Sequence, residues 1–423
     1  MKNYQFIDYL KQFKMKSLKT YLSCLLIVGA TAILWSQEEE QAPNQADFNL
    51  GEGLQFSFNE GNYLFNIGGF IQPSASFEKL SEADADFFFN SKRTYLIISG
   101  KALEEKVSFL LQSDFSFNQP LLDAWVAYHP TENITISAGQ KQTFLNNREM
   151  IYREDRLQFT DRSRLSQLFS ETGREFGLFV EGSFGTEFII SPAVAITSGD
   201  GRNSFGSDSR DTDKGGVKYG ARLDIYPLGA FKKGNDRYTA DLAHESQLKM
   251  LLGGAISYNN GASGPNGERH GDFLFFDANG IENLPDYSQQ YLDLLLKYKG
   301  FSFLGEYVNA SARGIELAFL DTAGANLLVP SQVSNFLVLG SSYSLQTGYV
   351  TKSGYSLDLR YEQTTPEFEN NLNSILLDAN SYSIGFTKYF RANNLKLQAS
   401  YSKTDFAQGT DISAAEILMQ IVF

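Results

Sequence analysis

The sequence is poor in the residues and runs that mark several large classes of protein. It has one cysteine, Cys24, and three histidines in 423 residues, which excludes a disulfide framework and a thiolate metal site. Proline is rare, at 10 residues against 36 glycines, and beyond the N-terminus no apolar run reaches the roughly 18 residues of a membrane-spanning helix. The formal net charge of −13, without a basic stripe, excludes a surface that follows nucleic-acid phosphates.

The N-terminus has the pattern of an export signal. A basic stretch, "KMKSLK", precedes the apolar stretch "TYLSCLLIVGATAILW", and the small residue Ser36 offers a cleavage point. We expect residues 1–36 to be a signal peptide, with Met1 or Met15 as the start. A retained membrane anchor and a lipid anchor on Cys24 are the alternatives. Residues 1–36 carry five basic and one acidic residue, so the mature net charge would be 31 − 48 = −17.

The rest of the chain is rich in aromatic residues (14%) and alternates between apolar and polar positions over many short segments. In "YLFNIGGFIQPSASF" (63–77) and "YSLDLRYE" (355–362), the odd-numbered residues are mainly apolar, and polar residues occupy the even positions. We count about sixteen such segments, most with the length of a tilted membrane-spanning strand. They lie near 62–78, 92–101, 106–117, 121–129, 133–141, 175–184, 186–198, 216–227, 246–258, 289–299, 301–310, 333–346, 353–363, 380–390, 394–403 and 413–423.

The connections between these segments alternate in length. Short links such as "ALEE", "KYKG" and "RANN" alternate with longer polar ones, and only 228–245, on the short side, breaks the rule. Short periplasmic turns and long external loops are typical of outer-membrane barrels. The sequence therefore predicts an all-β fold: a transmembrane antiparallel β-barrel of about 16 strands over 62–423, preceded by a short periplasmic arm over 37–61. A soluble β-sandwich or solenoid is the alternative.

The segment "AAEILMQIVF" at 414–423 continues the alternation up to Phe423. We expect this last strand to pair with the first and close the sheet, which removes its edges. A terminal strand that ends on an aromatic residue resembles the signal read by the barrel-assembly machinery, so that machinery is an expected partner.

The longest connection, 142–174, follows the fifth segment and is the third external loop. We expect it to fold into the lumen, where opposed arginine and carboxylate rows would select solutes by charge and dipole. Its six arginines are Arg148, Arg153, Arg156, Arg162, Arg164 and Arg174, and its five acids are Glu149, Glu154, Asp155, Asp161 and Glu171. The alternative is a solvated loop stabilised by its own ion pairs.

The stretch "KRTYLIISGK … SDFSF … LLDAWVAYHP … ISAGQKQTF … DRSRLSQLFSETGREFGLFVEG" resembles the phosphate-selective porin O and P family, and "SGDGRN" and "GGVKYGARLDIYPLG" continue the likeness. The resemblance implies a sixteen-stranded, trimeric channel in which basic residues guide anions. The candidates for the pore constriction and for anion guidance are Arg148, Arg153, Arg156, Arg162, Arg164, Arg93, Lys218, Arg222 and Arg360. Asp114, Asp123 and Asp224 put acids on the same presumed lumen face, which weakens the phosphate prediction.

We predict an outer-membrane porin of a Gram-negative bacterium, through which small ions and hydrophilic solutes diffuse passively, with the preference for anions or phosphate that the resemblance implies. Its expected surroundings are lipid, lipopolysaccharide and two further copies in a homotrimer. The alternative is a structural or adhesive barrel with a closed lumen. We expect no enzymatic activity, cofactor, metal or nucleic-acid partner, since His129, His244 and His270 fall outside any nucleophile or ligand motif. The acidic stretch "SEADAD" could hold Ca²⁺ only loosely.

Overall fold

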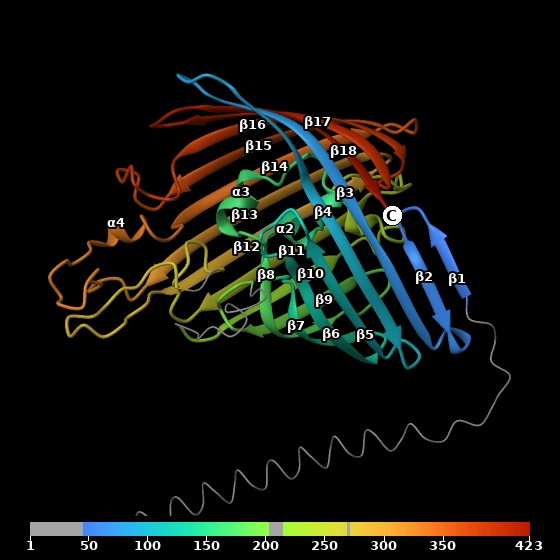
Figure 1. The fold of residues 1–423 in the computed structure, drawn as a ribbon, viewed down its shortest axis with the longest axis horizontal. Helices are drawn as coiled ribbons and strands as arrows, with labels where there is room; N and C mark the ends of the chain where they lie inside the picture. Colours follow the sequence, from blue (N-terminus) through green and yellow to red (C-terminus); the bar gives the residue numbers. More distant parts are fainter. Residues whose placement is uncertain (1–44, 203–214, 269–270) are drawn as a thin grey trace, which may run out of the picture. The chain divides into compact units, whose positions relative to one another are not determined.

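Sixteen antiparallel strands, β3 to β18, close into a barrel (Figure 1). The computed structural model describes residues 45–202, 215–268 and 271–423; the predicted signal peptide, the start of the predicted arm and His270 lie outside these ranges. The barrel strands are β3 (Tyr63–Leu80), β4 (Asp86–Ala102), β5 (Val107–Asp114), β6 (Leu121–Thr131), β7 (Ile134–Gln142), β8 (Arg174–Gly182), β9 (Ile189–Thr197), β10 (Lys218–Tyr226), β11 (Lys249–Asn259), β12 (Asp286–Tyr298), β13 (Phe301–Arg313), β14 (Gly340–Val350), β15 (Tyr355–Pro366), β16 (Ala379–Arg391), β17 (Leu395–Phe406) and β18 (Ile412–Val422).

Each predicted segment overlaps one of these strands, so the predicted all-β barrel is confirmed. The largest shift is in β14, which begins at Gly340 instead of 333. Pro330 lacks a backbone N–H and starts a short helix, α4 (Pro330–Val333), so the chain reaches the sheet later. At the other extreme, β4 begins at Asp86 instead of 92 because Glu78 still pairs with Asp86.

The alternation along each strand divides the barrel into an apolar outside and a polar inside. On β15, Tyr355, Leu357 and Leu359 are about half exposed, whereas Asp358 and Arg360 are buried in the lumen. Exposed aromatic side chains gather near the strand ends, as in the interfacial girdles of membrane barrels. They include Tyr298, Phe301, Tyr349, Tyr355 and Phe390 toward one end and Tyr219 and Tyr382 toward the other.

In the part of the chain that the structure describes, the helical elements are short and lie in the connections. Besides α4 they are α2 (Arg148–Ile151), α3 (Arg164–Phe169) and the 3-10 turns η1 (Asn59–Gly61), η2 (Glu154–Arg156) and η4 (Asn235–Arg237). No helix in the described ranges is both long and apolar enough to cross a membrane.

The barrel closes where β18 pairs with β3, as predicted, in a register that runs from Ile412–Leu80 to Val422–Phe70. Phe423 and Gly69 then exchange two backbone hydrogen bonds of 2.7 and 2.9 Å. The N-terminal arm forms a hairpin, β1 (Gln45–Asn49) and β2 (Gly53–Phe58), and β2 pairs with the first residues of β3. Figure 1 shows this hairpin and the C-terminus at one end of the barrel and α4 at the other.

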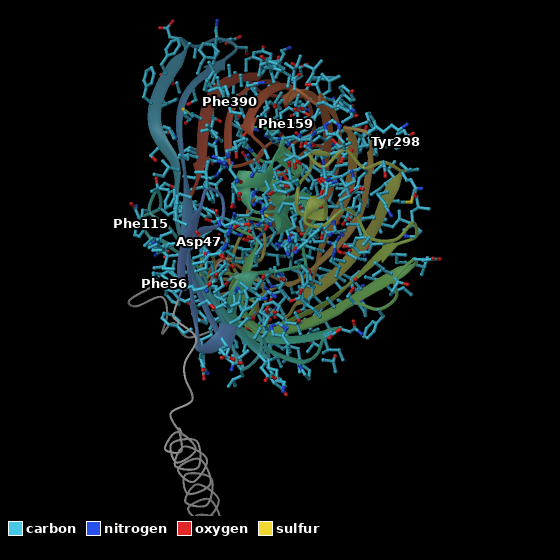
Figure 2. The ribbon with its side chains drawn as sticks, turned by 90° about the vertical axis from the view of Figure 1, so that its right-hand side faces the viewer. Asp47, Phe56, Phe115, Phe159, Tyr298 and Phe390 are labelled. Atoms are coloured by element: carbon cyan, nitrogen blue, oxygen red, sulfur yellow. The ribbon has the colours of Figure 1, made fainter. Side chains whose placement is uncertain are left out.

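Two connections enter the barrel. Residues 143–173, called the inner loop below, are largely buried and contact inward side chains of the wall, so the predicted entry of the third external loop into the lumen is confirmed. Viewed from the end with β1 and β2, Phe159 of this loop lies inside the ring of strands, and Tyr298 lies at its outer rim (Figure 2). The second connection, 227–248, belongs to the end with short turns.

Candidate functional site

The inner loop has little regular structure, so its buried backbone groups need partners from the wall. It turns at Ser163, whose hydroxyl caps α3 by accepting from the Ser166 amide at 3.1 Å. Carboxylates on the barrel wall accept from two further loop amides: Glu306 accepts from the Glu149 amide at 2.8 Å and Glu362 from the Leu165 amide at 3.1 Å. The loop is therefore fixed across the lumen by wall side chains instead of by its own secondary structure.

A four-residue charge cluster holds the start of the inner loop. Arg148 donates from Nε to Asp293 at 2.9 Å and also pairs with Asp224. Arg222, on β10, bonds the same two carboxylates and donates to the Asn146 carbonyl at 2.8 Å. Burial acts to lower the pKa of Arg148, but Asp293 and Asp224 outweigh it and raise that pKa well above its ordinary value. Two predicted cations are thus neutralised by two acids in a buried cluster.

The opposite side of the loop is fixed by Arg360 on β15. Its guanidinium donates to Glu149 at 2.6 Å and lies 4.2 Å from the centre of the Phe159 ring. Arg162 spans the loop itself, since it donates to Glu154 at 2.8 Å and to the carbonyls of Glu149 and Tyr152. Both predicted cations therefore hold the loop in its conformation.

Glu154 is the most strongly perturbed acid of the loop. It accepts from the Tyr95 hydroxyl at 2.9 Å as well as from Arg162, and Arg174 lies 3.8 Å away. Burial acts to raise its pKa, but the guanidinium groups of Arg162, Arg174 and Arg93 outweigh burial and hold the pKa well below its ordinary value of 4.5. The carboxylate is therefore charged at all physiological pH values.

A β-bulge in β4 brings two adjacent cations to the inner loop. Gln72 pairs with Arg93 and Pro73 with Ser91, which leaves Lys92 as the extra residue. Lys92 and Arg93 consequently both reach Asp161, each at 3.0 Å, although neighbouring strand residues normally face opposite sides. Burial acts to raise the pKa of Asp161, but Lys92 and Arg93 outweigh it and lower the pKa to about 2.

The remaining predicted cations divide into paired and unpaired groups. Arg153 pairs with Asp155, and Lys218 pairs with Glu175 at 2.7 Å. Within the described ranges, Arg156 and Arg164 make no ion pair: Arg156 lies over the Tyr238 ring at 5.9 Å and Arg164 over Phe406 at 4.9 Å. The Nε atoms of both lack a hydrogen-bond partner in this part of the chain, and burial lowers the pKa of both groups.

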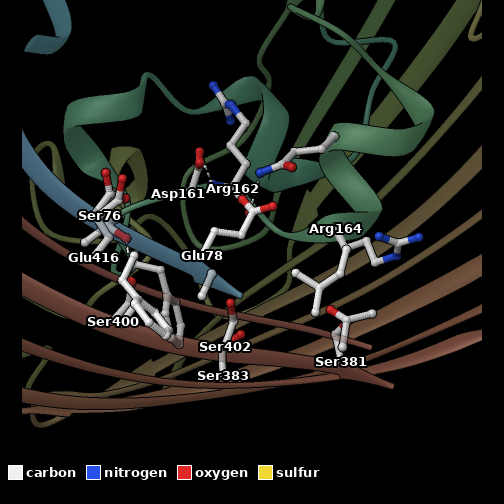
Figure 3. Close-up of a pocket in the computed structure, with 18 of the residues that line it drawn as sticks. Ser76, Glu78, Asp161, Arg162, Arg164, Ser381, Ser383, Ser400, Ser402 and Glu416 are labelled. Carbon is white, nitrogen blue, oxygen red and sulfur yellow. Dashed lines mark hydrogen bonds between the residues drawn. The ribbon is translucent and has the colours of Figure 1, made fainter. Parts of the chain in front are cut away.

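A cavity of about 400 Å³ lies between the inner loop and the wall formed by β15 to β18, β3 and β4. One side carries residues of the inner loop, among them Asp161, Arg162 and Arg164 (Figure 3). The other carries hydroxyls and two acids: Ser76, Ser381, Ser383, Ser400, Ser402, Thr404, Glu78 and Glu416. A hydroxyl-lined wall facing a guanidinium can solvate small polar solutes without binding one of them tightly.

Sequence reasoning named all nine candidate cations and most of the acids that pair with them, but not which acid pairs with which cation. Glu149, Glu154, Asp155 and Asp161 were recognised as loop acids, and Asp224 as a lumen acid. Asp293, Glu306, Asp358 and Glu362 were not singled out for the site, although the alternation on β12, β13 and β15 places each of them on the inward face. Inward carboxylates within apolar strands are the signal that would have identified them.

Catalytic and metal chemistry find little support in the described ranges. His129 contacts the hydroxyls of Ser108 at 2.8 Å and Thr135 at 3.0 Å, so a hydroxyl occupies the position that a carboxylate takes in a hydrolase triad. No group of three or more His, Cys, Asp or Glu side chains in these ranges is arranged to hold a metal ion.

Comparisons with known proteins give the fold. No family model matches the chain, and no curated protein matches it. Among solved structures, the outer membrane channel DcaP of Acinetobacter baumannii has a TM-score of 0.54 at 11% identity, covering 86% of this chain and 98% of that chain. The anion-selective porin from Comamonas acidovorans has a TM-score of 0.51 at 10% identity over 85% and 100%. Pseudomonas putida OprB has a TM-score of 0.51 at 9% identity over 85% and 94%.

At identities this low, the comparisons establish a similar fold and nothing about solutes. The membrane location follows from the barrel itself. A closed sheet satisfies its backbone groups between its own strands, so it can stand in hydrocarbon. Its outside carries exposed Leu and Ile side chains flanked by aromatic residues, and such a surface fits a lipid bilayer. The protein is therefore an outer-membrane barrel of a Gram-negative bacterium.

Proposed function

We propose that this protein is an outer-membrane porin through which small hydrophilic solutes diffuse passively. The observation that supports it is the hydroxyl-lined cavity of about 400 Å³ beside the inner loop, inside a barrel whose lumen face is polar. The cavity lies where the loop narrows the lumen, which is the position at which charge and size would select solutes. The solved structures of similar fold are named as porins and channels.

We propose that the channel prefers anions only weakly and has no dedicated phosphate site. Seven of the nine candidate cations have carboxylate partners, which leaves Arg156 and Arg164 in the described ranges. Of these two, Arg164 lines the cavity. A phosphate site needs several converging donors with few competing carboxylates. Arg164 is therefore the residue proposed to guide anions, and membership of the phosphate-selective porin O and P family remains part of the proposal.

We also propose how the protein is exported, assembled and oligomerised. Residues 1–36 would be removed as a signal peptide, β18 would present the assembly signal, and three copies would form a homotrimer surrounded by lipid and lipopolysaccharide. Catalysis has no part in it.

One observation favours the second candidate, a structural or adhesive barrel with a closed lumen. The inner loop bonds to the wall on many sides, through Arg148, Glu149, Glu154, Gln158 and Asp161. A loop held this firmly could seal the barrel.

Planar-bilayer recording of the purified mature protein distinguishes the two candidates. A porin gives stepwise conductance, and a salt gradient then gives a reversal potential toward the anion side that Arg164→Gln moves toward zero. Lys101→Gln, which removes an exposed cation at a turn, is the matched control and should change neither quantity. Conductance that phosphate blocks would support the phosphate-selective family role. Absence of conductance would refute the porin proposal and favour the closed barrel.

A further inference from the structure

Part of the connection 227–248 is buried, although it lies at the end where the other turns are short. Turns on this end occupy 103–106, 132–133, 183–188, 299–300, 351–354 and 392–394. Loops at such an end normally lie in water with their side chains exposed. In this connection, Phe231, Asn235, Thr239 and Asp241 are at most 7% exposed. The chain therefore turns back into the barrel from the periplasmic side.

The connection has its own buried polar framework. The side-chain amide of Asn235 donates to Asp241 at 2.9 Å and to Glu245 at 2.8 Å. Asp241 in turn accepts from the Glu245 amide and, at 2.7 Å, from the Gly300 amide in the turn between β12 and β13. A loop with internal and external bonds of this kind has a defined conformation inside the barrel.

A fully buried lysine on the wall anchors the connection. Lys297, on β12, donates from Nζ to the carbonyls of Asn235, Tyr238 at 2.7 Å and Ala240 at 2.9 Å. An ammonium group has three N–H donors, so these three carbonyls satisfy all of them. Burying that charge is costly unless every donor has a partner, and the loop provides the partners.

The connection also touches the inner loop. The Gln158 amide donates to the Thr239 hydroxyl at 3.0 Å, and the Thr239 amide donates to the Arg156 carbonyl at 3.4 Å. Phe231 packs in one apolar cluster with Tyr152 and Leu157 of the inner loop. Loops from opposite ends of the barrel therefore meet inside the lumen.

We propose that residues 227–248 form a periplasmic plug that closes one part of the lumen from below and sets the size limit of the channel jointly with the inner loop. The wall around the plug supports this assignment. Its apolar neighbours come from β11 to β14 and β16: Leu251, Leu295, Leu304, Val350 and Tyr389. The cavity described above lies instead beside β15 to β18, β3 and β4. Solutes are thus directed to that side because the plug and the inner loop together fill the other.

A cysteine at the contact between the two loops reports the plug directly. The mature chain contains no cysteine, so a thiol introduced by Thr239→Cys is labelled without background. We expect a membrane-impermeant maleimide to react with it far more slowly than with Glu132→Cys, which lies in an exposed turn at the same end. Labelling of Thr239→Cys at the rate of Glu132→Cys would overturn the proposal.

The lysine anchor provides the functional test. Lys297→Met removes all three carbonyl bonds and should speed labelling of Thr239→Cys, raise single-channel conductance and admit larger sugars into proteoliposomes. Lys249→Met is the matched control, because Lys249 also donates to a carbonyl of this connection, that of Leu228, but at the exposed base of the loop. Equal effects of the two substitutions would contradict the anchoring role of Lys297.

A second variant remains informative if Lys297→Met fails to fold. Residues 229–246 are replaced by a short Asn-Gly turn, and Lys297→Met is included so that no ammonium remains unpaired. Gel mobility before and after heating shows whether the barrel is intact. Unchanged conductance and sugar limit in this variant would overturn the plug proposal.

The conductance test of the plug rests on the proposed channel function. If the parent is silent and the plug-free variant conducts, the porin proposal fails and the plug stands. If both are silent, the porin proposal fails together with the role of the plug in setting a size limit.

Discussion

Neutralising Asp293 should release the first turn of the inner loop, because this one carboxylate holds two buried guanidinium groups. Asp293→Asn removes the charge that Arg148 and Arg222 share and leaves Asp224 to balance both cations. The side chains of Arg148 and Asp293 are 6% and 0% exposed, so water does not replace the lost partner. Removal of one member of a buried ion pair costs about 3–5 kcal/mol. Asp224 remains, so we take the lower value.

A loss of about 3 kcal/mol raises the equilibrium constant for local opening of the inner loop roughly a hundredfold, because each factor of ten corresponds to about 1.4 kcal/mol. Amide hydrogen exchange measures that equilibrium locally. We therefore expect peptides covering 146–158 to exchange about a hundredfold faster in Asp293→Asn, while peptides from the wall strand β5 keep their rates.

The matched control is Glu105→Gln, which breaks an ion pair with Lys101 whose side chains are 49% and 59% exposed. Exposed pairs contribute little to stability, so the exchange of the inner loop should not change. Exchange of 146–158 at the parent rate in Asp293→Asn would show that the charge cluster does not hold the loop, and the reasoning would fail.

Three further predictions use other parts of the structure. Asp161→Asn removes a carboxylate from the cavity and frees two cations there, so the reversal potential in a salt gradient should move toward the anion side; a move toward the cation side would contradict it. The pKa of Glu154 is depressed, so its stabilisation is complete above about pH 4.5 and is lost at lower pH; the difference in thermal midpoint between the parent and Glu154→Gln should shrink below that pH, and a constant difference would be inconsistent with it. A Cβ at Gly69 would lie 2.1 Å from the Tyr95 carbonyl oxygen, so Gly69→Ala should cost about 1–3 kcal/mol and lower folding yield, whereas Gly254→Ala, with its nearest neighbour at 3.3 Å, should not.

The fold could be predicted because successive residues of a barrel strand face lipid and lumen in turn, so apolar and polar residues alternate along the sequence. The segment 355–362 shows this directly, since every second side chain faces lipid and the intervening Asp358 and Arg360 face the lumen. The same pattern predicted the lumen side for the four candidate cations of the wall, which are buried there: Arg93, Lys218, Arg222 and Arg360. The other five candidate cations lie in the inner loop.

Their chemistry could not be predicted, because alternation says which face a residue occupies and nothing about what lies across the lumen. Arg148 and Asp293 are 145 positions apart, and only the closed barrel brings them together. The arginines consequently looked like free cations for anions, whereas most of them hold the inner loop in place. Residues 228–245 were recognised as too long for a periplasmic turn, but their polar composition resembles a solvated loop and gave no indication that they are buried.

The pairing at the barrel seam has a consequence for mechanical failure. One edge of β3 pairs with two strands in succession: β2 pairs with residues 63–67 and β18 with residues from Phe70 onward. Between them, Gly69 is hydrogen-bonded to Phe423. The turn between β1 and β2 is in turn tied to Asn394, which donates to the Leu50 carbonyl at 2.7 Å. These bonds hold β3 at its periplasmic end. Lateral opening between β3 and β18 is therefore expected to begin at the external end of the two strands.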